Sequence, residues 1–215
     1  MSYKGLLFDL DGTLIDTIAD LSDSMNHVLT GLGFPPHHET EYKSFVGSGI
    51  RNLARLALPE TARDEATIES CYRRMVEHYS RNSLNKTKPY EGIEELLDTL
   101  KARGLSMSVL SNKADAETQR IIAALLPGYF DLVIGMRSEE LKKPNPAMAL
   151  QIADSMKLRP EEIVYVGDSD IDILTACNAG MYAVGVLWGF RSREQLVQAG
   201  AATIVNHPAE IALLL

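Results

Sequence analysis

Residues 5–13 read GLLFDLDGT, a short apolar run that ends in two aspartates, a glycine and a threonine. An apolar run of this length, bounded by glycine and by acids, predicts a buried strand over 5–8 and a loop over 9–13. Farther along the chain, short apolar runs alternate with segments of helical period, which predicts a parallel sheet covered by helices on both faces. We therefore expect a doubly wound, Rossmann-like α/β core, with further strands at 106–110, 132–136, 163–166, 183–187 and 203–205.

The segment that follows the first strand has a different pattern, because nothing from residue 17 to residue 83 resembles a strand. Apolar residues recur there at helical spacing, and Thr17 and Asp20 fit a capping box at the start of the first helix. We therefore expect an all-helical cap domain inserted into the core. The predicted core comprises residues 1–15 and 90–215, and the predicted cap comprises residues 16–89.

Composition limits the classes of partner. The 215 residues include 21 Lys+Arg and 29 Asp+Glu, and a net charge of −8 disfavours nucleic acid or an anionic membrane as partner. The first apolar run meets an acid too soon for a signal peptide, and no run is long enough to cross a bilayer. Cys71 and Cys177 lie far apart in helical patterns, which excludes a disulfide framework and predicts two buried thiols. We expect a cytoplasmic protein, monomeric or homodimeric.

Polar residues gather where four of the predicted strands end, and the carboxyl ends of parallel strands form the ligand-binding edge of such a sheet. The first end holds Asp9 and Asp11, and the fourth holds Asp168, Asp170 and Asp172. Carboxylates this close cannot all stay ionised without a cation, and an all-oxygen set without histidine or cysteine favours Mg²⁺. The other two ends carry Ser-Asn-Lys at 111–113 and Lys-Lys-Pro at 142–144.

The order of these segments resembles the haloacid dehalogenase superfamily of phosphotransferases. The matching pieces are Asp-x-Asp-Gly-Thr at 9–13, Ser111, Lys-Pro at 143–144, and Gly-Asp-Ser at 167–169 followed by Asp172. Each piece is weak alone, but four in order at strand ends are specific. The position of the helical insert resembles the cap of the subfamily that includes phosphoglycolate phosphatases.

The resemblance and the chemistry of the side chains together suggest three catalytic residues. Asp9 would attack phosphorus in line and carry the phosphoryl group as an aspartyl-phosphate. Asp11 would protonate the departing alkoxide and later take a proton from water, and the resemblance adds its backbone carbonyl as a metal ligand. Lys143 would offset the negative charge that builds up on the transferring group.

Further residues are expected to bind the metal and the phosphate. Asp168 would complete the Mg²⁺ site, and Asp172 would orient Lys143 or a metal-bound water. Asp16 fits a helix cap better than a catalyst, and for Asp170 a role in the site and a solvent-facing position remain equally open. The expected metal ligands are Asp9, Asp11 and Asp168, and the expected phosphate-binding residues are Gly12, Thr13, Ser111 and Asn112.

Substrate specificity is expected from the helical insert, because the core residues address only the phosphate. Two connections to the core would let the insert close as a lid. Gly49 permits close backbone approach ahead of a helix start, and Arg51 can pair with a carboxylate, so both are predicted to bind the substrate. A short anionic ester such as 2-phosphoglycolate suits a site of this kind.

The sequence thus favours a Mg²⁺-dependent phosphomonoesterase that acts on a small phosphorylated metabolite, with 2-phosphoglycolate as the first choice. A sugar phosphomutase or an inorganic pyrophosphatase would use the same core residues under a different cap. Dehalogenases lack the second acid, so Asp11 argues against them, and nothing around Lys43 suggests the Schiff-base lysine of a phosphonate hydrolase. A non-catalytic binding protein on this fold could dispense with Asp9 and Asp11, yet both are present.

Overall fold

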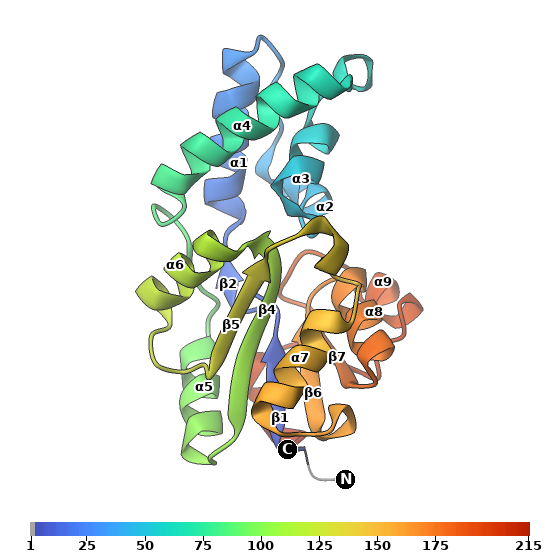
Figure 1. Ribbon diagram of the computed structural model, residues 1–215. Helices are drawn as coiled ribbons and strands as arrows, with labels where there is room; N and C mark the ends of the chain where they lie inside the picture. The colour runs from blue at the N-terminus through green and yellow to red at the C-terminus, as the bar shows by residue number, and fades with distance from the viewer. Residues whose placement is uncertain (1–2) are drawn as a thin grey trace. The chain divides into compact units, whose positions relative to one another are not determined.

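The computed structural model describes residues 3–215 and contains a six-stranded parallel sheet (Figure 1). The strands lie in the order β5-β4-β1-β6-β7-β8, which confirms the α/β Rossmann-like prediction. Their bounds are β1 Gly5–Phe8, β4 Ser106–Ala114, β5 Leu132–Met136, β6 Ile163–Gly167, β7 Tyr182–Val186 and β8 Thr203–Val205.

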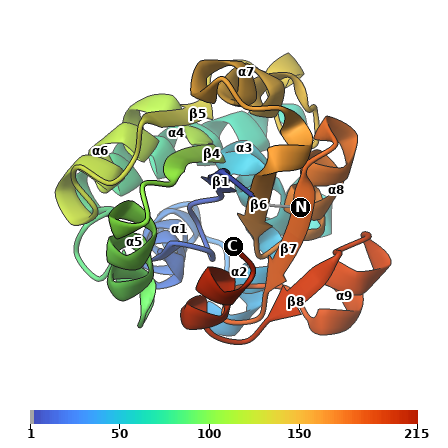
Figure 2. The same ribbon diagram turned by 90° about the horizontal axis from the view of Figure 1, so that it is seen from below.

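Helices cover both faces of this sheet. Buried apolar side chains of α7, α8 and α9 pack with Leu7, Leu110 and Tyr165 on one face. Figure 2 shows α5 and α6 on the opposite side of the strands. The bounds are α5 Ile93–Ala102, α6 Asp115–Leu125, α7 Ala147–Met156, α8 Asp170–Ala179 and α9 Arg193–Gln198, with short 3₁₀ helices η2 Glu139–Leu141, η3 Pro160–Glu162 and η4 Pro208–Leu213.

Strand β1 lies at the centre of the sheet, where the direction of strand addition reverses. Phe8 is in register with Val109 of β4 on one side and with Val166 of β6 on the other. All four residues of β1 are buried, as its uniformly apolar sequence predicts. Ligands in open parallel sheets bind at such a reversal, so the residues that follow β1, β4 and β6 occupy the position of a functional site.

The chain divides into two compact units, one formed by the chain up to Ile15 with Pro89–Leu215, the other by Asp16–Lys88. The second unit is helical, and buried side chains such as Met25 of α1 and Met75 of α4 form part of its core. That it acts as a cap remains a prediction. The helices of this unit are α1 Ile18–Gly31, α2 Glu39–Phe45, α3 Gly49–Ala57, η1 Glu60–Ala62 and α4 Glu65–Asn82. The short strands β2 Ile15–Asp16 and β3 Lys88–Pro89 pair with each other at the two points where the chain passes from one unit to the other.

The capping box predicted at Thr17 and Asp20 is wrong. Thr17 is the N-cap of α1 but makes no side-chain capping hydrogen bond. Asp20 instead accepts hydrogen bonds from the backbone N–H groups of Lys86 and Thr87 and from the Thr87 hydroxyl. The carboxylate thus ties the first helix of the unit to the segment that leaves it, a contact between residues more than sixty positions apart that local spacing could not reveal.

Two smaller expectations also fail. The thiol of Cys177 is exposed, whereas Cys71 is buried as expected. The predicted strand ends at residue 110, whereas β4 continues to Ala114. The polar residues 111–113 are buried and extended within this strand. Within residues 3–215, no helix combines the length and the apolar character needed to cross a membrane.

Candidate active site

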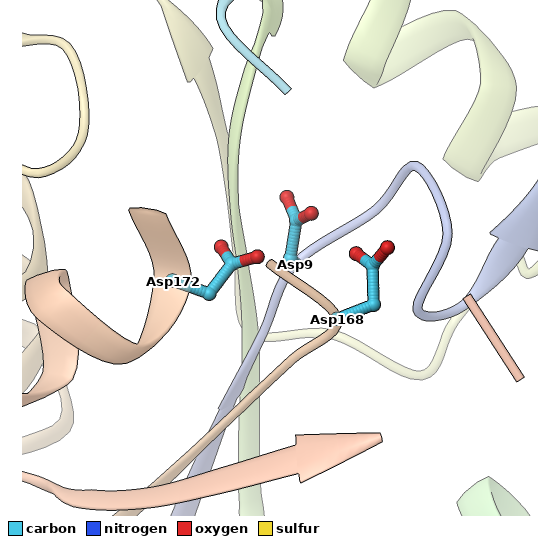
Figure 3. A group of neighbouring side chains, drawn as sticks. All are labelled: Asp9, Asp168 and Asp172. Carbon is cyan, nitrogen blue, oxygen red and sulfur yellow. The ribbon is translucent and has the colours of Figure 1, made fainter. Parts of the chain in front are cut away.

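Asp9 is the first residue after β1 and lies at the carboxyl end of the sheet. Its N–H donates to the Val166 carbonyl at 2.9 Å, so the pairing of β1 with β6 fixes the backbone that carries the carboxylate. Asp168 follows β6 directly, and Asp172 lies in the first turn of α8. The three side chains offer carboxylate oxygens that all lie within 4.8 Å of one another (Figure 3).

The ammonium group of Lys143 links two of these carboxylates. Its Nζ donates to Asp9 Oδ1 and to Asp172 Oδ1, each at 2.7 Å, and to the Leu110 carbonyl at 3.1 Å. The Asn112 amide accepts from the Lys143 N–H at 2.9 Å and donates to the Lys143 carbonyl at 3.2 Å. Asn112 therefore holds the lysine in place, and its expected contact with phosphate remains a prediction.

Asp172 has both carboxylate oxygens engaged inside the protein. Oδ1 accepts from Lys143, with the Tyr165 hydroxyl at 3.4 Å, and Oδ2 accepts from the N–H and the hydroxyl of Ser169. These contacts correspond to one of the two roles expected for it, the orientation of Lys143.

The site carries more negative charge than one lysine can offset. Burial raises the pKa of Asp9 to about 7, the charge of Asp172 adds to the shift, and Lys143 opposes it. Burial, together with Asp172 and Asp9, also holds the pKa of Asp168 well above its usual range. Burial alone would lower the pKa of Lys143, but the two facing carboxylates outweigh it and raise that pKa well above the ordinary value. Such a cluster favours a bound cation.

Asp168 is oriented by two other segments of the chain. The Thr13 hydroxyl donates to Oδ1 at 3.2 Å, and the Phe190 N–H donates to Oδ2 at 2.8 Å. Glycines at 12 and 189 allow this approach, since a Cβ at Gly12 would lie 2.4 Å from Asp168 Oδ2 and one at Gly189 would lie 2.3 Å from Asp168 Cβ. With Asp9 beside it, Asp168 supplies the oxygen donors that a hard divalent cation prefers.

Backbone hydrogen bonds within the loop after β1 form a tight turn. Gly12 has a φ of +90°, its N–H donates to the Ile15 carbonyl at 3.0 Å, and the Thr13 N–H donates to the Leu10 carbonyl at 3.3 Å. The Trp188 indole Nε1 donates to the Thr13 carbonyl at 2.9 Å. The N–H groups of Gly12 and Thr13 are thus used within the turn, and the expected contacts of these two residues with phosphate remain predictions.

Asp11 is not part of the three-carboxylate group. Its two oxygens accept from Lys113 Nζ at 2.9 and 3.0 Å, and the lysine side chain is only 2% exposed against 14% for the aspartate. The Lys113 N–H in turn donates to the hydroxyl of Ser111 at 3.2 Å. The expected roles of Asp11 and Ser111 toward metal and phosphate remain predictions, and Lys113 is a polar contact of the site that we did not anticipate.

The remaining expected residues lie outside this network. The half-exposed side chain of Asp170 is 3.6 Å from the Arg191 guanidinium, and it is not a member of the carboxylate group. Arg51 forms ion pairs with Glu65 and Glu69 within the helical unit. Gly49 is the first residue of α3 and adopts a φ of +80°. The substrate contacts of Gly49 and Arg51 remain predictions.

Comparison with known proteins identifies the family. The protein-family model described as "haloacid dehalogenase-like hydrolase" matches residues 6–186, which is most of the chain. The chain belongs to this family. The match includes every core residue expected to act, from Asp9 to Asp172, and confirms the resemblance drawn from the four motifs.

Relatives that align with most of this hydrolase are named phosphatases. A phosphoglycolate phosphatase of Aquifex aeolicus is 35% identical over 86% of this chain and 85% of its own. One of Chromobacterium violaceum is 33% identical over 97% of this chain and 94% of its own. The crystal structure of a predicted phosphoglycolate phosphatase from Haemophilus somnus superposes with a TM-score of 0.90 at 28% identity, covering 100% of this chain and 98% of that one.

Sequence reasoning missed three residues of this hydrolase that position other residues, namely Lys113, Trp188 and Phe190. Lys113 stood in the quoted Ser-Asn-Lys segment, and a lysine at the end of a buried strand facing predicted acids was the available signal. The contact of Trp188 with Thr13 and that of Phe190 with Asp168 span more than twenty residues and carry no local periodicity.

Proposed function

We propose that this hydrolase is a Mg²⁺-dependent phosphatase that cleaves 2-phosphoglycolate through an aspartyl-phosphate. The observation that carries the proposal is the position of Asp9, which lies at the end of the central strand between Lys143 and the carboxylate of Asp168. Relatives named phosphoglycolate phosphatases, which align with most of this chain, support the choice of substrate.

The contacts of Asp9 suit a nucleophile. Lys143 holds Oδ1, while Oδ2 has no hydrogen-bond partner among residues 3–215. In the first step, an oxygen of Asp9 forms a bond to phosphorus as the ester oxygen leaves, and Asp11 gives that oxygen a proton. In the second step, Asp11 takes a proton from water, whose oxygen attacks phosphorus and releases Asp9 and inorganic phosphate.

Two residues handle the charge of the transferring group. Lys143 keeps a positive charge next to Asp9, where negative charge builds up on the phosphoryl oxygens. Asp9 and Asp168 would hold Mg²⁺, which when bound supplies further positive charge to the phosphoryl oxygens. Asp168 accepts hydrogen bonds from the Thr13 hydroxyl and the Phe190 N–H, and these two bonds fix the orientation of its carboxylate.

The deciding experiment is a panel of phosphate esters assayed with Mg²⁺ and with EDTA and ranked by kcat/KM. We expect hydrolysis only with the metal and the highest kcat/KM for 2-phosphoglycolate. Turnover that survives exhaustive chelation would contradict the metal dependence. A higher kcat/KM for a neutral sugar phosphate would contradict the substrate, and phosphate transfer to a sugar would indicate a mutase.

A further inference from the structure

The contact between Lys113 and Asp11 bears on how the substrate is recognised. Within the core unit the two buried lysines of the site have different carboxylate partners: Lys143 contacts Asp9 and Asp172, whereas Lys113 contacts Asp11 through both oxygens. Removing an ammonium group from water is costly, so a lysine that is 2% exposed needs anionic partners. Asp11 is such a partner.

The position of Asp11 defines what lies near Lys113 when a substrate is bound. If Asp11 gives a proton to the leaving oxygen, one of its oxygens comes within about 3 Å of that atom. Lys113 Nζ, 2.9 and 3.0 Å from the Asp11 oxygens, then lies within roughly 6 Å of the leaving oxygen. In 2-phosphoglycolate a single CH₂ separates the leaving oxygen from a carboxylate, so this anion falls within reach of the ammonium.

We propose that Lys113 recognises the carboxylate of the substrate, which shares the ammonium with Asp11 while the ester is bound. The inference rests on the proposed function, because it takes Asp11 as the residue that protonates the leaving group. Under this proposal the residue that selects an anionic leaving group is Lys113 of the core unit, which lies on the same strand as Ser111. The other buried lysine of the site is less suited, since Lys143 already bridges two carboxylates.

Three esters separate substrate recognition from a positioning role. 2-Phosphoglycolate and 2-hydroxyethyl phosphate have leaving groups of similar size that both need protonation, but only the first carries a carboxylate. p-Nitrophenyl phosphate has a good leaving group that needs little help from Asp11. We expect Lys113→Met to lower kcat/KM for 2-phosphoglycolate by about thirtyfold, mainly through KM, and to change kcat/KM for the other two esters less than about threefold.

A binding measurement and two further variants complete the test. With Asp9→Asn to prevent turnover, calorimetry with Mg²⁺ present should show a Kd for 2-phosphoglycolate about tenfold higher when Lys113→Met is added. Lys113→Arg, which keeps the charge, should retain part of the preference. The matched control is Lys101→Met, because that lysine donates to the Gly128 carbonyl on the surface of the same unit, and its kinetics should be those of the wild type.

The outcomes distinguish this inference from the proposed function. Equal losses of kcat/KM on 2-phosphoglycolate and 2-hydroxyethyl phosphate would overturn it, because Lys113 would then only position Asp11. Equal losses on all three esters would also overturn it, since the lysine would support the site as a whole. If the wild type hydrolyses none of the esters with Mg²⁺, the proposed function itself is wrong.

Discussion

At the scale of single residues, the proposed chemistry depends on Asp9, whose carboxylate is buried beside two others and one lysine. We expect Asp9→Asn to abolish turnover, because an amide of the same shape cannot act as the nucleophile. We also expect its melting temperature without metal to be no lower than that of the wild type, since the substitution removes a charge from a repulsive cluster.

Steady-state kinetics and thermal unfolding of Asp9→Asn check both parts of this prediction, with mass spectrometry to exclude deamidation. Asp23→Asn is the control, because Asp23 pairs with Lys86 on the exposed side of α1 and should leave kcat unchanged. A kcat above about one twentieth of the wild-type value, a loss of less than about 2 kcal/mol in transition-state stabilisation, would rule out the covalent mechanism.

At the scale of elements, the segment that follows β7 contacts the site from outside the four motifs that carry the expected catalytic residues. Phe190 donates to Asp168, and Gly189 fits against both Asp168 and the Gly12 carbonyl, which would lie 2.4 Å from an added Cβ. We expect Gly189→Ala to displace Asp168 and to weaken Mg²⁺ binding by about tenfold or more, roughly 1.4 kcal/mol.

Calorimetric titration of the Gly189→Ala protein with Mg²⁺ measures this effect directly. Gly31→Ala is the matched control, because nothing lies within 4 Å of a Cβ added there. Unchanged Mg²⁺ affinity in Gly189→Ala would mean that Asp168 is not a metal ligand, or that the segment adapts to the added methyl group.

At the scale of the whole molecule, the raised pKa of Asp9 couples stability to pH. The folded chain holds a proton up to about pH 7 that the unfolded chain releases near its ordinary pKa of 3.8. The stabilisation from this proton is therefore complete below pH 3.8 and is lost as pH rises through about 7. The loss approaches about 1.4 kcal/mol per pH unit for one proton.

Thermal unfolding in EDTA between about pH 4 and pH 7, the interval between the two pKa values of Asp9, should show a contribution from Asp9 that falls with rising pH. Asp9→Asn should flatten the profile, and Mg²⁺ should restore stability at the alkaline end because it binds the folded chain. A wild-type profile that coincides with that of Asp9→Asn would show that Asp9 keeps an ordinary pKa.

The sequence alone predicts the strands of the sheet more completely than it predicts the side-chain contacts of the site. Apolar runs such as 5–8 and 163–166 are buried because both faces of the sheet are covered, so their composition alone locates Asp9 and Asp168. Three hydrogen bonds join distant residues: Lys143 N–H donates to Asn112, Lys113 Nζ donates to Asp11, and Thr87 N–H donates to Asp20. Such pairs depend on tertiary packing, which no local spacing records.

The hydrogen bond from Trp188 to the Thr13 carbonyl gives the molecule a built-in optical reporter. Trp188 is the single tryptophan in the chain, so its ultraviolet emission comes from one known place, against the loop that follows β1. The emission of an indole depends on the polarity around its ring and on the partner of its N–H. Changes in this loop can therefore be followed in the native protein without an added fluorophore, on the time scale of a single turnover.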